Sequence, residues 1–517
     1  MQLLPKAPPS PTRKSIETLQ AEALSHGLKR SLGPVGLMLL GVGNIVGAGA
    51  YVMIGTAAGS FAGPAVILSF LIAAVACGLT ALCYAELASM IPVSGSAYTY
   101  CYASLGQSYA WFLGWLILLD YGLAGSTLAV GLSGYLVSLL SSFHLHIPMQ
   151  LASATILRTP HSDLITIGPR VNLLAVGALA AATAVLIRGV SESSAINNIL
   201  VAIKISILAI FVVAGLGALQ PHNWTPFIPP NEGGFTFGWA GVARAASVLF
   251  FAFLGFETVS AAASEARNPQ RDMPFGILGA LLVCTIIYIA VAVVLTGLIP
   301  YRELAVSDAI AVAADRMGHP NLAILLKVGA LVGISSVLLM NGYGQSRVAF
   351  AISRDGLLPR IFSRLHPRFQ TPHIGITVLA AISAAGAALF PLSLLIDLVS
   401  LGTALSFSIV SASVMWLRST RPDLARPFRV PLGGLQIGSV WIGIVPIAAI
   451  FMCWAMMAPV VVDIYQQAAG GDAFPALFIC GYLAAGAAIY FGYGRRNAHV
   501  AAEVAVIDLL QAGGAHE

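Results

Sequence analysis

Long apolar stretches alternate with short polar segments along almost the whole chain. One α-helix crosses the hydrocarbon core of a membrane with about 20 apolar residues, and the chain contains about twelve stretches of suitable length. Pro, Gly and most of the charged residues collect between them. The predicted spans are 35–59, 64–91, 107–141, 172–188, 193–219, 238–264, 274–299, 321–352, 373–390, 392–417, 436–460 and 474–494. This pattern predicts an all-α polytopic membrane protein.

The composition supports a membrane protein and argues against several other classes. Of the 517 residues, 58% are hydrophobic and 9% are charged, whereas about 25% of the residues in an ordinary soluble domain are charged. The six cysteines fall in or beside apolar spans without metal-like spacing, so they are interpreted as small buried side chains. No GxxxxGK[ST] loop that would bind ATP phosphates is present in the sequence. We therefore expect neither an enzyme nor a bound metal or cofactor.

Lys and Arg are unevenly divided between alternate loops. If the N-terminus is cytoplasmic, most of these residues lie in cytoplasmic loops, which is the bias found in membrane proteins. Both termini are therefore predicted to be cytoplasmic. The same bias explains the net charge of +5, and we expect the basic loops to contact the lipid bilayer rather than nucleic acid. The first span has no preceding cleavage signal and is expected to remain as a signal-anchor.

Two predicted spans contain features that interrupt a helix. The first reads GVGNIVGAGAYVMIGTAAG, and such a glycine-rich run forms a weak helix, although small residues can also serve close helix packing. The sixth reads FFAFLGFETVSAAASEARNP, with the carboxylate of Glu257 in mid-span, where a charge is costly unless it faces a cavity or a partner. Breaks in the first and sixth spans are typical of five-helix inverted repeats that bind substrate where the breaks meet.

This interpretation predicts the organisation of the whole chain. Spans one to five form a first repeat over 35–219, and spans six to ten form a second, inverted repeat over 238–417. Two extra helices occupy 436–494. Cytoplasmic segments, 1–34 and 495–517, lie at the two ends.

The two breaks also predict how a small zwitterion binds. The N-terminus of a half-helix exposes N–H groups that attract a carboxylate, while freed carbonyl groups accept hydrogen bonds from an ammonium group. Glu257 is a candidate substrate contact, a gate, or a cap on the N–H groups of the following half-helix. The predicted contacts in the first break are Val46, Gly47, Ala48, Gly49 and Ala50, and those in the sixth are Phe251, Ala252, Phe253, Leu254 and Phe256.

Several stretches of the sequence resemble one family of transporters. They are KRSLGPVGLMLLGVGNIVGAG, AGPAVILSFLIAAVACGLTALCYAELASMIPVSGSAYTYCYASLG, FFAFLGFETVSAAASEARNPQRDMPFGI, SRVAFAISRDGLLP and RPDLARPFRVP. They resemble the amino acid-polyamine-organocation superfamily, and within it the cationic amino acid transporter family, including bacterial members that carry neutral amino acids. The resemblance covers about residues 15–495. It implies the inverted-repeat fold, alternating access, amino acid substrates and, for a bacterial member, a location in the inner (plasma) membrane.

The resemblance also suggests roles for charged residues within the spans. Lys204 in the fifth span matches a lysine that replaces the sodium ion of sodium-coupled relatives, which implies a proton as the coupling ion; the alternative is a snorkelling side chain. Asp120 matches a glutamate that can pair with this lysine, so it is the predicted proton partner or, alternatively, a structural charge. Arg244 and Lys327, near span ends, are interpreted as snorkelling side chains.

The first functional hypothesis is proton-coupled uptake of small or medium neutral L-amino acids. Ile334 in the eighth span occupies what resembles the subsite for the substrate side chain, and its predicted neighbours are apolar. Asn44 and Ala50 differ from the alanine and isoleucine that are common in similar sequences. The alternatives are a transporter or exchanger of cationic amino acids or polyamines, and a receptor of this fold that senses an amino acid. The oligomeric state stays open.

Overall fold

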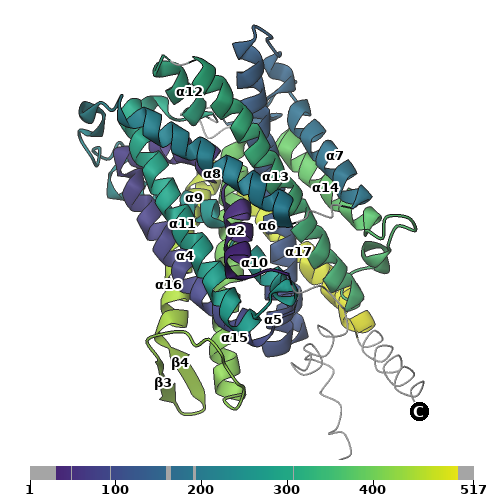
Figure 1. Cartoon of the computed structure of the whole chain (residues 1–517). Helices are drawn as coiled ribbons and strands as arrows, with labels where there is room; N and C mark the ends of the chain where they lie inside the picture. Colours follow the sequence, from purple (N-terminus) through teal and green to yellow (C-terminus); the bar gives the residue numbers. More distant parts are fainter. Residues whose placement is uncertain are drawn as a thin grey trace, which may run out of the picture.

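The computed structural model describes residues 31–47, 49–93, 95–158, 165–189, 194–306, 308–318 and 320–498. In this part of the chain, long α-helices pack side by side in one bundle (Figure 1). Within these residues, nine helices are long and apolar enough to cross a membrane, and three further apolar helices are shorter. The predicted fold class, an all-α polytopic membrane protein, is confirmed. The division into two inverted repeats stays a prediction.

The helices follow most of the predicted apolar segments closely. The predicted span 436–460 is corrected, because its first residues lie in a β-hairpin and its helix covers Ile444–Ala469. Their bounds are α2 (Pro34–Ile45), α3 (Ile54–Ala57), α4 (Val66–Met90), α5 (Ser96–Ser104), α6 (Gln107–Ser142), α7 (Leu173–Arg188), α8 (Ser194–Leu216), α9 (Gly238–Phe250), α10 (Thr258–Ala261), α11 (Pro269–Leu298), α12 (Ala309–Arg316), α13 (Pro320–Arg354), α14 (His373–Leu389), α15 (Leu392–Thr420), α16 (Ile444–Ala469) and α17 (Phe474–Ile489). The strands form two antiparallel hairpins, β1 (Ile156–Arg158) with β2 (Ile165–Ile167) and β3 (Gly434–Ile437) with β4 (Val440–Gly443).

The helix of the first span is interrupted where the glycines cluster. α2 ends at Ile45, Val46 takes an extended conformation, and the chain resumes as a π-helical turn over Gly49–Met53. A Cβ atom added at Gly49 would lie 2.8 Å from the Ala252 Cβ atom. Glycine therefore serves both expected purposes here. It weakens the helix at the break, and it allows the backbone of Ala252 to approach closely.

The sixth span is interrupted as well. α9 ends at Phe250, one 3₁₀ turn follows over Phe251–Phe253, and α10 begins only at Thr258. Between them Gly255 has φ +124°, and a Cβ atom there would lie 2.9 Å from the Asn44 carbonyl carbon. Glycine is required because other residues rarely adopt this φ and because the first break passes directly beside it.

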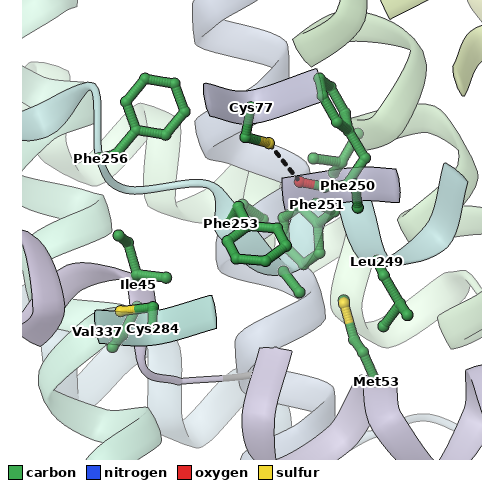
Figure 2. Packing of buried hydrophobic residues seen from close by; sticks show 14 of the residues in the cluster. Ile45, Met53, Cys77, Leu249, Phe250, Phe251, Phe253, Phe256, Cys284 and Val337 are labelled. Carbon is green, nitrogen blue, oxygen red and sulfur yellow. Dashed lines mark hydrogen bonds between the residues drawn. The ribbon is translucent and has the colours of Figure 1, made fainter. Parts of the chain in front are cut away.

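Helices far apart in the sequence enclose the two breaks. α11 packs against α2 and α4, while α6 packs against α13 and α15. Figure 2 shows the buried side chains beside the breaks, where the Cys77 Sγ atom lies 4.0 Å from the Phe250 carbonyl oxygen. The buried core is therefore continuous around the interrupted helices.

The prediction that the Arg244 side chain snorkels to the membrane surface is wrong. Arg244 on α9 is 2% exposed and pairs with Asp397 on α15 and Asp463 on α16. Lys327 on α13 is 4% exposed, but its ammonium group pairs at 3.2 Å with Asp315, whose side chain is 52% exposed, so snorkelling of Lys327 stays a prediction. A charged side chain can remain buried when a carboxylate from another helix faces it, and such long-range partners are not visible in the local sequence.

Candidate functional site

A small cavity of ≈ 40 Å³ lies where the two breaks meet. Four segments surround it: the end of the first helix half, the broken sixth span, the middle of α6 and the middle of α13. Its lining residues are Asn44, Ile45, Gly49, Tyr121, Ala124, Leu128, Phe251, Ala252, Leu254, Gly255, Glu257, Thr258, Val337, Met340 and Asn341. The cavity thus combines apolar walls with a few polar groups, as ligand sites in proteins do.

Most of the predicted substrate contacts fall into two groups. Those that line the cavity are Gly49, Phe251, Ala252 and Leu254, together with Glu257. Those buried in the surrounding packing without lining it are Val46, Ala50, Phe253, Phe256 and Ile334. Gly47 faces α13, since a Cβ atom there would lie 2.8 Å from Val337 Cγ2. Ala48 lies outside the described residues.

Phe253 and Phe256 pack in aromatic clusters instead of lining the cavity. The Phe253 ring centroid lies 5.5 Å from that of Tyr288 on α11, and the Phe256 centroid lies 5.6 Å from that of Tyr84 and 5.1 Å from that of Phe407. Such ring contacts stabilise the irregular segment beyond the area that they bury. These two residues therefore hold the shape of the sixth break.

Tyr288 connects the two breaks directly. Its hydroxyl oxygen lies 2.7 Å from the Ile45 carbonyl oxygen and 3.0 Å from the Ala252 carbonyl oxygen, so these two acceptors share its one proton. Both carbonyl groups lie where a helix is interrupted, and the last carbonyl groups of a helix have no following N–H group within it. Tyr288 is fully buried on α11, and the sequence prediction missed it. The available signal was a phenol within an apolar helix, because a buried tyrosine usually finds a partner for its hydroxyl group.

A hydrogen-bonded network joins the first break to the sixth. The Asn44 Nδ2 atom donates to Thr258 Oγ1 at 2.6 Å, and the Thr258 hydroxyl group donates to the Gly255 carbonyl oxygen at 2.6 Å. The Glu257 carboxylate accepts from the Gly255 N–H group at 2.8 Å. Glu257 therefore stabilises the turn that precedes α10, and it makes no side-chain cap on α10 itself.

Lys204 on α8 lies between α2 and α13. Its Nζ atom donates to the Gly43 carbonyl oxygen at 2.8 Å, just before α2 ends, and its side chain is 1% exposed. A Cβ atom at Gly333 on α13 would lie 3.6 Å from Lys204 Cγ. The ammonium group is thus buried among α2, α8 and α13, which is incompatible with snorkelling in this structure.

Asp120 lies at a different helix interface. Its Oδ2 atom accepts from the Ser406 hydroxyl group of α15 at 3.3 Å, and a Cβ atom at Gly402 would meet the same carboxylate. Its Oδ1 atom is buried and has no hydrogen-bond partner among the described residues. Asp120 therefore packs against α15 and makes no ion pair with Lys204 within the described chain, so its role as proton partner stays a prediction.

Other lining residues were missed because they come from helices without breaks. Asn341 donates from Nδ2 to the Tyr121 carbonyl oxygen at 2.7 Å, which joins α13 to α6 at the cavity wall. Ile334 was predicted from α13, but Val337, one helical turn further along, lines the cavity instead. The rotation of a long apolar helix about its axis depends on its neighbours, and a nearly uniform apolar sequence does not encode it.

The amino-acid sequence of this chain is similar to those of known proteins. Residues 32–484 match the amino acid permease family. A methylthioribose transporter of Bacillus subtilis (strain 168) is 40% identical over 486 residues, which cover 94% of this chain and 98% of the relative. A branched-chain amino acid permease of the same organism is 39% identical over 469 residues, which cover 88% of this chain and 97% of the relative.

Other relatives, from plants and mammals, are named as cationic amino acid transporters. A vacuolar cationic amino acid transporter of Arabidopsis thaliana is 38% identical over 398 residues, which cover 77% of this chain and 65% of the relative. The predicted resemblance is thereby confirmed. The chain belongs to the amino acid permease family within the amino acid-polyamine-organocation superfamily, and it is a multi-pass membrane transporter rather than an enzyme.

Proposed function

We propose that this protein is a secondary active transporter that takes up small or medium neutral L-amino acids together with protons by alternating access. It acts in the plasma membrane, the inner membrane of a bacterium, with both termini in the cytoplasm. The observation that carries the proposal is the buried Lys204 ammonium group on the Gly43 carbonyl oxygen, next to the break that borders the cavity.

The two breaks support recognition of an amino acid by its backbone. Interrupted helices leave N–H and C=O groups without intrahelical partners, and these groups match a carboxylate and an ammonium group. The cavity of ≈ 40 Å³ holds only about three water molecules. Binding of an amino acid therefore requires its walls to separate, as alternating access also does.

Lys204 supports coupling to protons. A buried ammonium group is costly to keep charged, and loss of its proton removes a donor from the Gly43 carbonyl oxygen near the end of α2. Because α2 ends at the cavity, the protonation state of Lys204 and the shape of the binding site influence each other. Reciprocal coupling between two sites is what a symporter requires.

The apolar part of the wall supports neutral substrates. Ala124, Leu128 and Val337 line the cavity on the α6 and α13 sides, and the branched-chain permease is a relative over nearly the whole chain. A cationic amino acid is the second candidate, because the Glu257 carboxylate lines the same cavity and several relatives are named for cationic substrates.

The proposal is tested by uptake of radiolabelled alanine, valine and arginine into proteoliposomes with and without an inward proton gradient. We expect the gradient to drive accumulation of a neutral amino acid, and Lys204→Ala to abolish that accumulation. Lys327→Ala is the matched control, since it removes a second buried lysine whose partners, Ser142 and Asp315, do not line the cavity.

Other outcomes would point to other functions. Accumulation that survives Lys204→Ala contradicts coupling through this lysine. Flux that requires an amino acid inside the vesicle indicates an exchanger. Binding without flux indicates a receptor, and gradient-driven uptake of arginine alone favours the cationic substrate class.

A further inference from the structure

Asn44 presents an unused acceptor at the cavity. It lies in the last turn of α2, lines the cavity and is 6% exposed. Its Oδ1 atom is buried and has no hydrogen-bond partner among the described residues. Buried polar atoms are nearly always paired, so an exception calls for an explanation such as a ligand or an ordered water molecule.

The neighbouring hydrogen bonds determine which end of the Asn44 amide group has no hydrogen-bond partner among the described residues. The Thr258 hydroxyl proton is used in the bond to the Gly255 carbonyl oxygen at 2.6 Å. Thr258 Oγ1 can then only accept, so the atom of Asn44 that faces it at 2.6 Å must be the Nδ2 donor. Side-chain amides are oriented by their hydrogen-bond networks, and this network leaves the carbonyl end, Oδ1, without a donor.

A second acceptor lies on the same wall. Glu257 also lines the cavity, and its carboxylate uses one oxygen, Oε2, for the Gly255 N–H group at 2.8 Å. An ionised carboxylate accepts hydrogen bonds and cannot donate. This part of the wall therefore complements a ligand that carries hydrogen-bond donors.

We propose that Asn44 is a specificity-determining residue, whose Oδ1 atom accepts a hydrogen bond from a hydroxyl or amine group on the side chain of the transported amino acid. The inference rests on the proposed transport function, in which the backbone groups of the two breaks bind the α-carboxylate and the α-ammonium group. In this arrangement Asn44 contacts the side chain of the substrate. Among neutral substrates the protein prefers L-threonine to L-valine, which has nearly the same shape but a methyl group in place of the hydroxyl group.

The test compares initial rates of threonine and valine uptake into proteoliposomes for the wild-type protein, Asn44→Ala and Thr258→Val. The ratio of the two rates cancels differences in the amount of folded protein. We expect threonine to be favoured about 10-fold by the wild-type protein, since a site with a buried polar group discriminates against an analogue that cannot pair with it. Asn44→Ala should bring the ratio close to one.

Thr258→Val tests how far recognition of the substrate by Asn44 depends on the orientation of the Asn44 amide group. It removes the hydrogen bond that orients the Asn44 amide group but keeps the Asn44 carbonyl group beside the cavity, so the preference for threonine should fall only in part. A wild-type ratio near one overturns the inference. A preference for threonine that survives Asn44→Ala also overturns it, because another group would then recognise the hydroxyl group of the substrate.

Failure of the inference and failure of the proposed function give different results. If no amino acid is transported by the wild-type protein, the proposed function is wrong. If valine and threonine are transported equally, the function stands and the role of Asn44 is wrong. Direct binding, measured as protection of the purified protein against thermal unfolding by each amino acid, should show the same order as the uptake rates.

Discussion

Arg244 on α9 and Asp397 on α15 form an ion pair of 2.7 Å in which the side chains are 2% and 6% exposed. Asp463 on α16 supplies a second carboxylate at 3.0 Å, and the Phe61 ring centroid lies 5.1 Å from the guanidinium carbon. The first half of the sixth span is therefore fixed to two helices that lie outside the broken segments.

Arg244→Leu should lower the free energy of unfolding by about 3–5 kcal/mol, because it leaves the buried carboxylate of Asp397 without its guanidinium partner. Thermal unfolding of the purified protein in detergent measures the change. Arg302→Leu is the control, since the Arg302–Glu232 pair is 59% and 41% exposed and exposed pairs contribute about 1 kcal/mol or less. Similar losses in both variants would contradict a special role for the buried pair.

Gly255→Ala should destabilise the protein by about 2 kcal/mol or more and greatly reduce transport. The residue would keep φ +124° only with strain, and its Cβ atom would lie 2.9 Å from Asn44. Gly481→Ala on α17 is the matched control, because no atom lies within 4 Å of a Cβ atom there. Stability and uptake should be measured together, and normal uptake by Gly255→Ala would show that the crossing of the breaks is not required.

Tyr288→Phe should slow transport roughly 10-fold while the fold is retained, because two buried carbonyl groups at the breaks lose the one hydroxyl donor that they share. Initial uptake rates per amount of folded protein provide the measurement. Tyr465→Phe on α16 removes a hydroxyl group from a side chain that is 73% exposed and should have no effect. An unchanged rate in Tyr288→Phe would mean that the breaks keep their geometry without this bridge.

Glu86→Gln should lower stability by roughly 1.5–3 kcal/mol, the contribution of hydrogen bonds to a charged group. Glu86 is buried at the end of α4, where it accepts from Arg418 Nε at 2.9 Å and from the Val430 N–H group at 2.7 Å. It thereby joins α4 to α15 and the loop that follows. Glu303→Gln, in an exposed pair with Arg316, is the control for thermal unfolding. Equal stability of both variants would contradict this structural role.

The sequence by itself determined the membrane fold and the positions of the two breaks. Runs of apolar residues define spans because the backbone in lipid must satisfy its own hydrogen bonds. The glycines around Gly47 and Gly255 mark the interruptions because their effect on the backbone is local. The motifs near these breaks also identified the family, which the comparisons confirm.

Only the tertiary structure decided which side chains face the cavity and which pairs form. Asn44 and Thr258 are separated by 214 residues, Tyr288 and Ile45 by 243, and Arg244 and Asp397 by 153. The same apolar stretch predicts Ile334 and Val337 equally well as cavity residues. The rotation of each helix about its axis and the approach of distant segments depend on the packing of the whole bundle. The local pattern of residues does not determine either of them.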